Sequence, residues 1–164
     1  MTQQNPFGRA YAAIESALKA WSPLTTLVFP GNIQNLQATG YKPRNTVQSA
    51  DRPELMLTEQ RMGFQPFSFN ATGVSFRCSY PLKISSGSLG IEKLNIVSWE
   101  VGRALNAIGP QLGMPEIVQE WEIPSDGQAR ASDPTAKRPD WTVLLVIVVQ
   151  FAMTRQQYMN TTFT

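Results

Sequence analysis

The sequence contains no histidine among its 164 residues. Histidine is the commonest general base, a common metal ligand and the usual pH switch, so its absence narrows the catalytic chemistry open to the chain. There is one cysteine, Cys78, which excludes a disulfide within the chain and fits a reducing compartment. Because Cys78 lies on the apolar side of its predicted strand, we interpret it as a buried small side chain rather than a nucleophile.

Charged residues are scarce as well, at 16% of the chain against about 25% in typical globular proteins. This favours a surface that is largely covered in an assembly, although a monomer with few surface charges also fits. The net charge of +2 is too small to indicate a nucleic-acid or membrane partner. The apolar run 143–149 is far shorter than the roughly 20 residues of a membrane-spanning helix. The first residues contain no basic stretch followed by an apolar run, so we expect no secretory signal.

Helical and strand patterns alternate along the chain. Apolar residues recur at helical spacing over 7–21 and again over 91–108. Strand patterns cover 54–60, 74–84, 116–123 and 141–153, and 24–29 is predicted to be a strand or an extended turn. These patterns predict a single domain, 1–164, of the α+β class. Its antiparallel or mixed sheet would be flanked by two main helices, in the order α-β-β-α-β-β.

The segment from Trp141 to Met153 is the most informative, because nearly every residue on both sides of this predicted strand is apolar. The abundance of β-branched residues favours a strand over a buried helix. Such a strand is expected at the centre of a sheet and covered on both faces. The chain's own helices can cover one face, and a second subunit could cover the other.

No residue pattern supports a catalytic or cofactor site. The stretch 87–90 lacks the spacing and the lysine of a phosphate-binding loop. Glu120 and Glu122 share one face of a strand, as the paired carboxylates of a glycosidase do, but two glutamates on a solvated face explain them more simply. Trp99, in the second long helix, is expected to pack in the core or in an interface. We therefore predict no enzymatic activity, no metal and no organic cofactor.

Two long polar segments separate these elements. The segment 39–53 contains two prolines and is predicted to be an extended arm lying across a neighbour, or equally a solvated surface loop. The segment 124–140 is predicted to be a long hairpin loop whose charges balance, which argues against a DNA clamp and suits contacts between subunits. A solvated loop explains it equally well. The residues that we expect at a subunit interface or lining a lumen are Arg130, Lys137, Arg138, Asp126 and Asp133.

Several stretches resemble the tail terminator family of long-tailed bacteriophages and its neck and tail-completion relatives. They are AYAAIESALKAW, VSFRCSYPLKI leading into GIEKLNIVSWEVGRALNAI, and the pair EIVQEWEI and WTVLLVIVVQFAM. The resemblance runs from about Phe7 to Met153 and lies in pattern and element order, since these families have no diagnostic residue motif. The arm at 39–53 departs from the simplest family members, which leaves a neighbouring neck or baseplate component as an alternative.

The resemblance implies a structural virion protein that forms a ring, typically hexameric, at the end of the tail tube and joins the tail to the head. The implied partners are further copies of the chain, the tail tube protein, neck or connector proteins and, in a contractile tail, the sheath protein. Neither a membrane nor specific nucleic-acid binding is implied. The expected location is the virion, and the host cytoplasm during assembly. The alternative is a small α+β ligand-binding module or enzyme subunit that acts as a monomer or dimer.

Overall fold

The computed structural model describes residues 6–35, 53–57, 68–69, 73–124, 128–131, 134–135, 137 and 139–160. Its helices are α1 (Pro6–Ala20), α2 (Ser22–Thr25), α3 (Gly90–Ala107) and α4 (Arg155–Asn160), with short 3-10 helices at Pro30–Asn32 and Gly87–Leu89. Its strands are β1 (Ile33–Asn35), β2 (Glu54–Leu57), β3 (Ser68–Phe69), β4 (Val74–Ser85), β5 (Val118–Glu122), β6 (Arg130–Ala131) and β7 (Trp141–Met153). The arm predicted at 39–53 lies outside the described residues except for Pro53.

The strands form one mixed sheet in the order β1-β2-β4-β7-β5. Every residue of β4 pairs with β7 in one unbroken antiparallel register, from Val74 opposite Met153 to Ser85 opposite Thr142. The short strands β3 and β6 pair with opposite ends of this long ribbon, while β1 and β2 are parallel. The predicted α+β fold is confirmed, and β7 lies between two neighbouring strands as expected.

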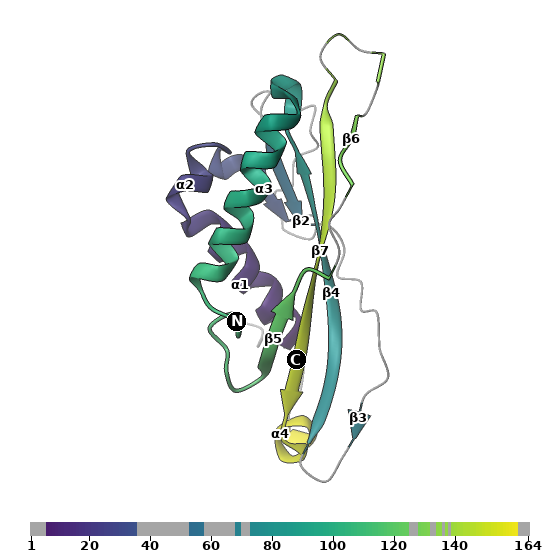
Figure 1. The fold of residues 1–164 in the computed structure, drawn as a ribbon. Helices are drawn as coiled ribbons and strands as arrows, with labels where there is room; N and C mark the ends of the chain where they lie inside the picture. Colours follow the sequence, from purple (N-terminus) through teal and green to yellow (C-terminus); the bar gives the residue numbers. More distant parts are fainter. Residues whose placement is uncertain are drawn as a thin grey trace.

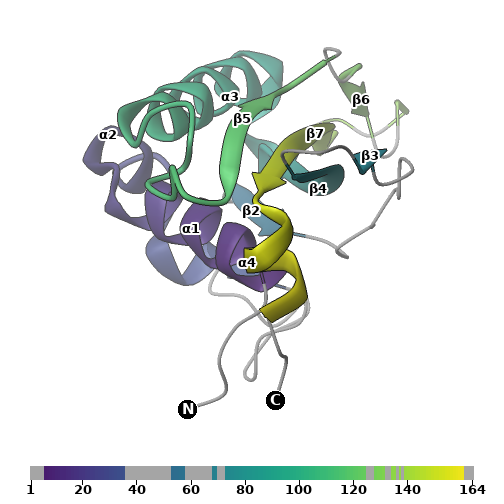
Figure 2. The same cartoon turned by 90° about the horizontal axis from the view of Figure 1, so that it is seen from below.

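The helices α1, α2 and α3 all lie on one side of the sheet (Figures 1 and 2). They cover the face to which the even-numbered residues of β4 and the odd-numbered residues of β7 point. Phe76 and Phe151, opposite each other in the register, stack with their ring centroids 5.0 Å apart, and Phe7 of α1 packs on both rings. This aromatic contact joins the first helix to the two longest strands.

Two buried tyrosines also connect α1 to the sheet. The Tyr80 hydroxyl donates to the Phe7 carbonyl oxygen at 2.8 Å, and the Tyr11 hydroxyl donates to the Leu57 carbonyl oxygen at 2.9 Å. A buried hydroxyl needs such a partner, because an unpaired one costs about 1–3 kcal/mol. Burial raises the pKa of Tyr11 to about 12, and it raises the pKa of Tyr80 as well. Both phenols are therefore held in the neutral form.

Two expectations about local structure need correction. The stretch 24–29 is not extended, because Leu24 lies in the one-turn helix α2 and points into the core. Pro23 fits the first turn of a helix, where its missing N–H is not needed, so it begins α2 as well as ending α1. The segment 124–140 is not loop throughout, because Arg130 and Ala131 form β6 and extend the hairpin along the start of β7.

Pro81 lies in the middle of β4, where a residue without an N–H needs a strand edge. The pairing of β2 with β4 ends at Leu82, the residue that follows Pro81 in the chain. In the described part of the chain, Pro81 is therefore paired with only one strand, at Val146 of β7. A missing N–H is tolerated where a strand has one open edge.

Candidate functional site

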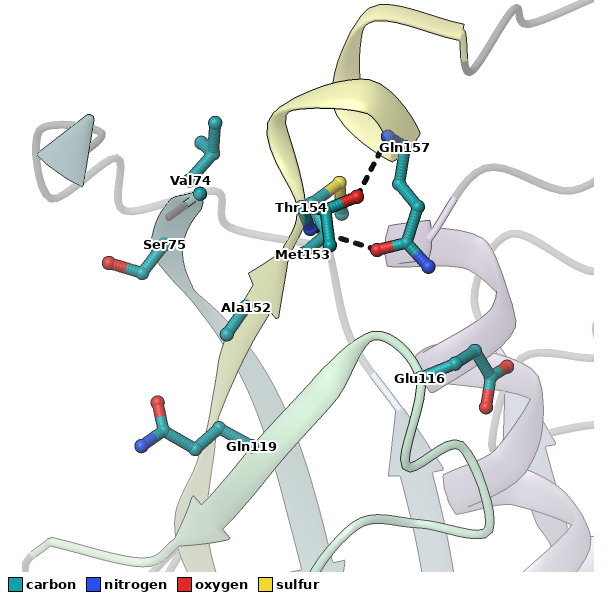
Figure 3. A pocket seen from close by; sticks show the side chains of 9 residues that line it. Val74, Ser75, Glu116, Gln119, Ala152, Met153, Thr154 and Gln157 are labelled. Atoms are coloured by element: carbon teal, nitrogen blue, oxygen red, sulfur yellow. Dashed lines mark hydrogen bonds between the residues drawn. The ribbon is translucent and has the colours of Figure 1, made fainter. Parts of the chain in front are cut away.

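A pocket of about 410 Å³ lies where β7 ends and α4 begins. Its lining residues are Gly73, Val74, Ser75, Glu116, Gln119, Ala152, Met153, Thr154 and Gln157 (Figure 3). Thr154 and Gln157 form a reciprocal helix cap: the Thr154 N–H donates to Gln157 Oε1 at 2.8 Å and the Gln157 N–H donates to Thr154 Oγ1 at 3.1 Å. Both side chains thus serve the first turn of α4.

Glu116 is the one carboxylate that lines this pocket, and its chemistry is not that of a catalytic acid. Figure 3 shows its side chain turned toward α1, where Arg9 Nη2 donates to Glu116 Oε1 at 2.8 Å. Its own backbone N–H and the Arg9 guanidinium lower the pKa of Glu116. A general acid working near neutral pH needs a raised pKa instead. The pocket thus offers no catalytic pair.

Neither Cys78 nor the acidic side chains of the described residues form a reactive or metal-binding site. Cys78 is 0% exposed, and burial raises the pKa of its thiol, so the residue is the buried small side chain that the sequence predicts. Across the described ranges, no three acidic or cysteine side chains come together in a group that could hold a metal ion. In the same part of the chain, no helix is long and apolar enough to cross a membrane.

The face of the sheet turned away from the helices is the first notable surface, and we call it the open face. On β7 it carries Leu144, Val146 and Val148, of which Leu144 is 49% exposed and the two valines are partly exposed. A solvated sheet face normally carries polar residues, so this apolar stripe is unusual for an exposed position. The helices of the chain cover only the other face, as the sequence allowed.

Charged residues flank the apolar stripe of the open face in an ordered way. Lys83 of β4 lies opposite Leu144, and Glu122 of β5 lies opposite Val148. In the next row toward the end of β7, Arg77 and Glu120 lie on either side of Gln150. These four charged residues are all exposed. Glu120 and Glu122 therefore stand on an open strand face, as the simpler of the two sequence interpretations predicted.

The outer side of α3 is the second notable surface, and we call it the α3 stripe. Its apolar members are Leu89, 52% exposed, Ile96, 50% exposed, and Trp99, 70% exposed. Glu92 and Arg103 lie on the same side of the helix, because residues three, four and seven positions apart share one face. The buried residues of α3 face the sheet from the opposite side. The α3 stripe thus exposes a tryptophan and two other apolar side chains in the single chain.

The structure describes two of the five residues that were predicted from the sequence to lie at a subunit interface or to line a lumen. Arg130 is exposed in β6, opposite Thr142 of β7, and so lies on the open face beyond Leu144. Lys137 is exposed in the return segment of the hairpin. The other three predicted site residues, Asp126, Asp133 and Arg138, lie outside the described residues.

The base of this hairpin is fixed to the fold. The Gly87 N–H donates to Asp140 Oδ1 at 3.0 Å, and the Ser86 N–H donates to the Trp141 carbonyl oxygen at 2.9 Å. The Asp140 carboxylate therefore accepts a hydrogen bond within the chain, and it holds the base of the hairpin next to the start of α3.

The α3 stripe was missed from the sequence, although a signal for it exists. The sequence pattern predicts a buried side of this helix made of Ile91, Leu94, Val97, Val101, Leu105 and Ile108. For Ile91 this prediction was wrong, because Ile91 lies at the edge of the buried side and is 40% exposed. Ile96 and Trp99 fall outside that pattern, and large apolar residues outside the buried stripe of an amphipathic helix indicate a second apolar face. Trp99 was expected in the core or an interface, and its exposure excludes the core of the single chain.

The fold is similar to that of a chain in a solved structure described as the virion of a native gene transfer agent (GTA) particle. The two chains superpose with a TM-score of 0.55 and 14% sequence identity, over 86% of this chain and 92% of that chain. No known family's sequence model matches the chain, and no curated protein matches it. At this identity the similarity establishes a shared fold across nearly the whole of both chains, and function has to be argued separately.

Proposed function

We propose that the protein is a structural component of a phage-like virion and that it forms a ring, of six subunits by its family resemblance, at the end of the tail tube. The observation that carries this proposal is the shared fold with a chain of the gene transfer agent virion, over 86% of this chain and 92% of that one. Coverage this complete means that the whole domain is shared, and not one common motif. The proposed partners are the tail tube protein, neck proteins and, in a contractile tail, the sheath.

Surface composition supports the assembly role. Within the described residues, the open face and the α3 stripe expose apolar side chains on opposite sides of the layered fold. Monomeric soluble proteins rarely leave large apolar patches uncovered. A ring of identical subunits covers such surfaces without leaving a free edge. The proposed role is mechanical, and it needs no catalytic residue, metal or cofactor.

The hairpin 124–140 is proposed to contact a neighbouring subunit or to line the lumen of the ring. Arg130 and Lys137 are exposed on it and can donate charge-assisted hydrogen bonds to carboxylates of an adjacent copy. The same role is proposed for Arg138, Asp126 and Asp133. Exposed ion pairs contribute only about 0–1 kcal/mol each, so the hairpin would act through the sum of its contacts.

Deleting the gene and inspecting the particles by electron microscopy tests the proposed function. We expect heads and tails that fail to join, together with tails of irregular end structure, and restoration when the gene is supplied in trans. Mass spectrometry of purified wild-type particles should find the protein at about six copies for each tail, the number being that of the family resemblance. Normal infectious particles made without the protein would refute the proposal.

A further inference from the structure

We infer that the ring closes by head-to-tail contact, in which the α3 stripe of one copy packs on the open face of the next copy. The inference rests on the proposed function, because it names the surfaces by which copies associate. It assigns one occupant to each of these two surfaces. A two-fold contact of the open face with itself would leave Leu89, Ile96 and Trp99 uncovered.

The two surfaces match in apolar character. The α3 stripe presents Ile96 and Trp99 at its centre, and the open face presents Val146 and Val148 at its centre. Aromatic residues that enter an apolar surface of a partner are the usual energetic centres of protein interfaces. A helix lying along a sheet also matches the packing within the chain itself, where α3 already covers the other face of β7 (Figure 1).

The charges of the two surfaces match better in one orientation than in the other. The α3 stripe has an acidic residue, Glu92, toward its start and a basic residue, Arg103, toward its end. The open face has Lys83 near the start of β7, and Arg130 lies beyond it on the same face. Toward the end of β7 the open face carries two carboxylates of β5, Glu120 and Glu122, and one basic residue of β4, Arg77. Placing Glu92 near Lys83 therefore makes α3 of the neighbour run in the same direction as β7.

The spacing of these charges agrees with that orientation. Glu92 and Arg103 are eleven residues apart, which spans about 16 Å along a helix. On the open face, Glu122 lies four residues and Glu120 lies six residues further along β7 than Lys83. These separations span about 14–20 Å along a strand. Both ends of the helix stripe can therefore meet an opposite charge at the same time. Arg103 keeps its 3.0 Å bond to Glu100 and remains half exposed for this contact.

The direction required by the charges is also the direction that a ring allows. Within one chain, α3 and β7 run in the same direction along the long axis of the molecule (Figure 1). A rotation about an axis parallel to the strands preserves these directions in every copy. The neighbour's α3 then reaches the open face parallel to β7, as the charges favour. Repetition of this head-to-tail contact gives a ring when the rotation between copies closes.

Thiol cross-linking tests the contact directly. Cys78→Ala removes the single native thiol, and Ile96→Cys and Val146→Cys then place one thiol on each surface. The double-cysteine chain, treated with a short bismaleimide in assembled particles, should give a ladder of cross-linked multimers. Each single-cysteine chain should remain uncross-linked. Ser16→Cys on the exposed side of α1, paired with Val146→Cys, is the matched control and should not cross-link.

Charge reversal supplies a second measurement. Glu92→Lys and Lys83→Glu should each lower incorporation into particles about two- to five-fold, and the double reversal in one chain should restore it, because the pair forms between copies. Dimers from Val146→Cys alone would overturn the inference in favour of a two-fold contact, and cross-links to another virion protein would overturn it in favour of a different occupant. No cross-link in particles that contain the protein would also overturn it.

If the protein is absent from particles, the proposed function fails, and the same cross-linking of the purified full chain then decides the contact separately. A ladder from the purified double-cysteine chain would support the contact without the virion. Its absence there would overturn the contact as well.

Discussion

Adjacent valines of β7 provide a sharp test of which sheet face is covered by the chain and which by a neighbour. Val149 is 0% exposed and points into the core beneath the helices, whereas Val148 lies on the open face and is partly exposed. Replacing each by threonine keeps the β-branched shape and the strand propensity. The substitution therefore changes mainly polarity, at two positions with the same strand context.

The expected free-energy changes differ because the two side chains differ in burial. Val149→Thr loses apolar burial of about 0.8 kcal/mol and buries a hydroxyl at about 1–3 kcal/mol, so we expect a destabilisation of about 2–4 kcal/mol. Val148→Thr should change the free energy of unfolding by less than about 1 kcal/mol, since water reaches the new hydroxyl. Urea unfolding followed by tryptophan fluorescence measures both values. With a slope of roughly 2 kcal/mol/M, the midpoint for Val149→Thr should fall by about 1–2 M.

In an assembly measurement, Val148→Thr should have a large effect, although it has the smaller effect on the free energy of unfolding. In a mixture of wild-type and variant chains, the chain with Val148→Thr should be under-represented in particles although it is folded, because its hydroxyl meets the neighbour's α3 stripe. Equal destabilisation of the isolated chain by both substitutions would show that the open face is covered within one copy. Normal incorporation of Val148→Thr would show that no partner covers it.

Gly73→Ala should destabilise the fold by about 1–3 kcal/mol in urea unfolding, because the added Cβ overlaps the Met153 carbonyl oxygen. Gly102→Ala, which has open space around the new Cβ inside α3, should stabilise the fold by about 0.5–1 kcal/mol. A neutral Gly73→Ala would contradict the close approach of the chain at the start of β4 to the end of β7. Above pH 10 the free energy of unfolding should fall as pH rises. The unfolded chain releases the Tyr11 and Tyr80 protons near their ordinary pKa of 10.0, whereas the folded chain keeps both protons, because the pKa of Tyr11 is raised to about 12 and that of Tyr80 is raised as well. Spectrophotometric titration should show that Tyr11 and Tyr80 release their protons above the ordinary pKa of 10.0, and release of both near 10 would contradict this. Shortening 124–140 to a tight turn should leave circular dichroism unchanged but abolish complementation of a defective phage, and full complementation would show that the hairpin is solvated surface.

Periodicity located the long elements well, because each carries its own apolar face. The alternation over 74–84 predicts β4 within one residue, and the two-sided apolar segment predicts the central place of β7. The prediction at 24–29 was wrong because a short apolar stretch fits a strand and a buried helical turn equally well. There Pro23 at the start of a turn decides the outcome.

Tertiary pairing explains what could not be predicted from the sequence. The chain order does not show that β7 lies between β4 and β5, which places Lys83 and Glu122 on either side of one apolar stripe. The exposure of Trp99 likewise depends on which side of α3 meets the sheet. The charges of the open face were visible in the sequence, but their arrangement comes from the register.

Electron cryo-microscopy of particles that contain the protein tests the central claim most directly. We predict density for a closed ring of copies at the end of the tail tube, with Trp99 of each copy lying on Val146 and Val148 of the next. A ring in which α3 faces solvent or another protein would contradict the head-to-tail contact. Location of the protein away from the tail end, or as isolated copies, would contradict the proposed function itself.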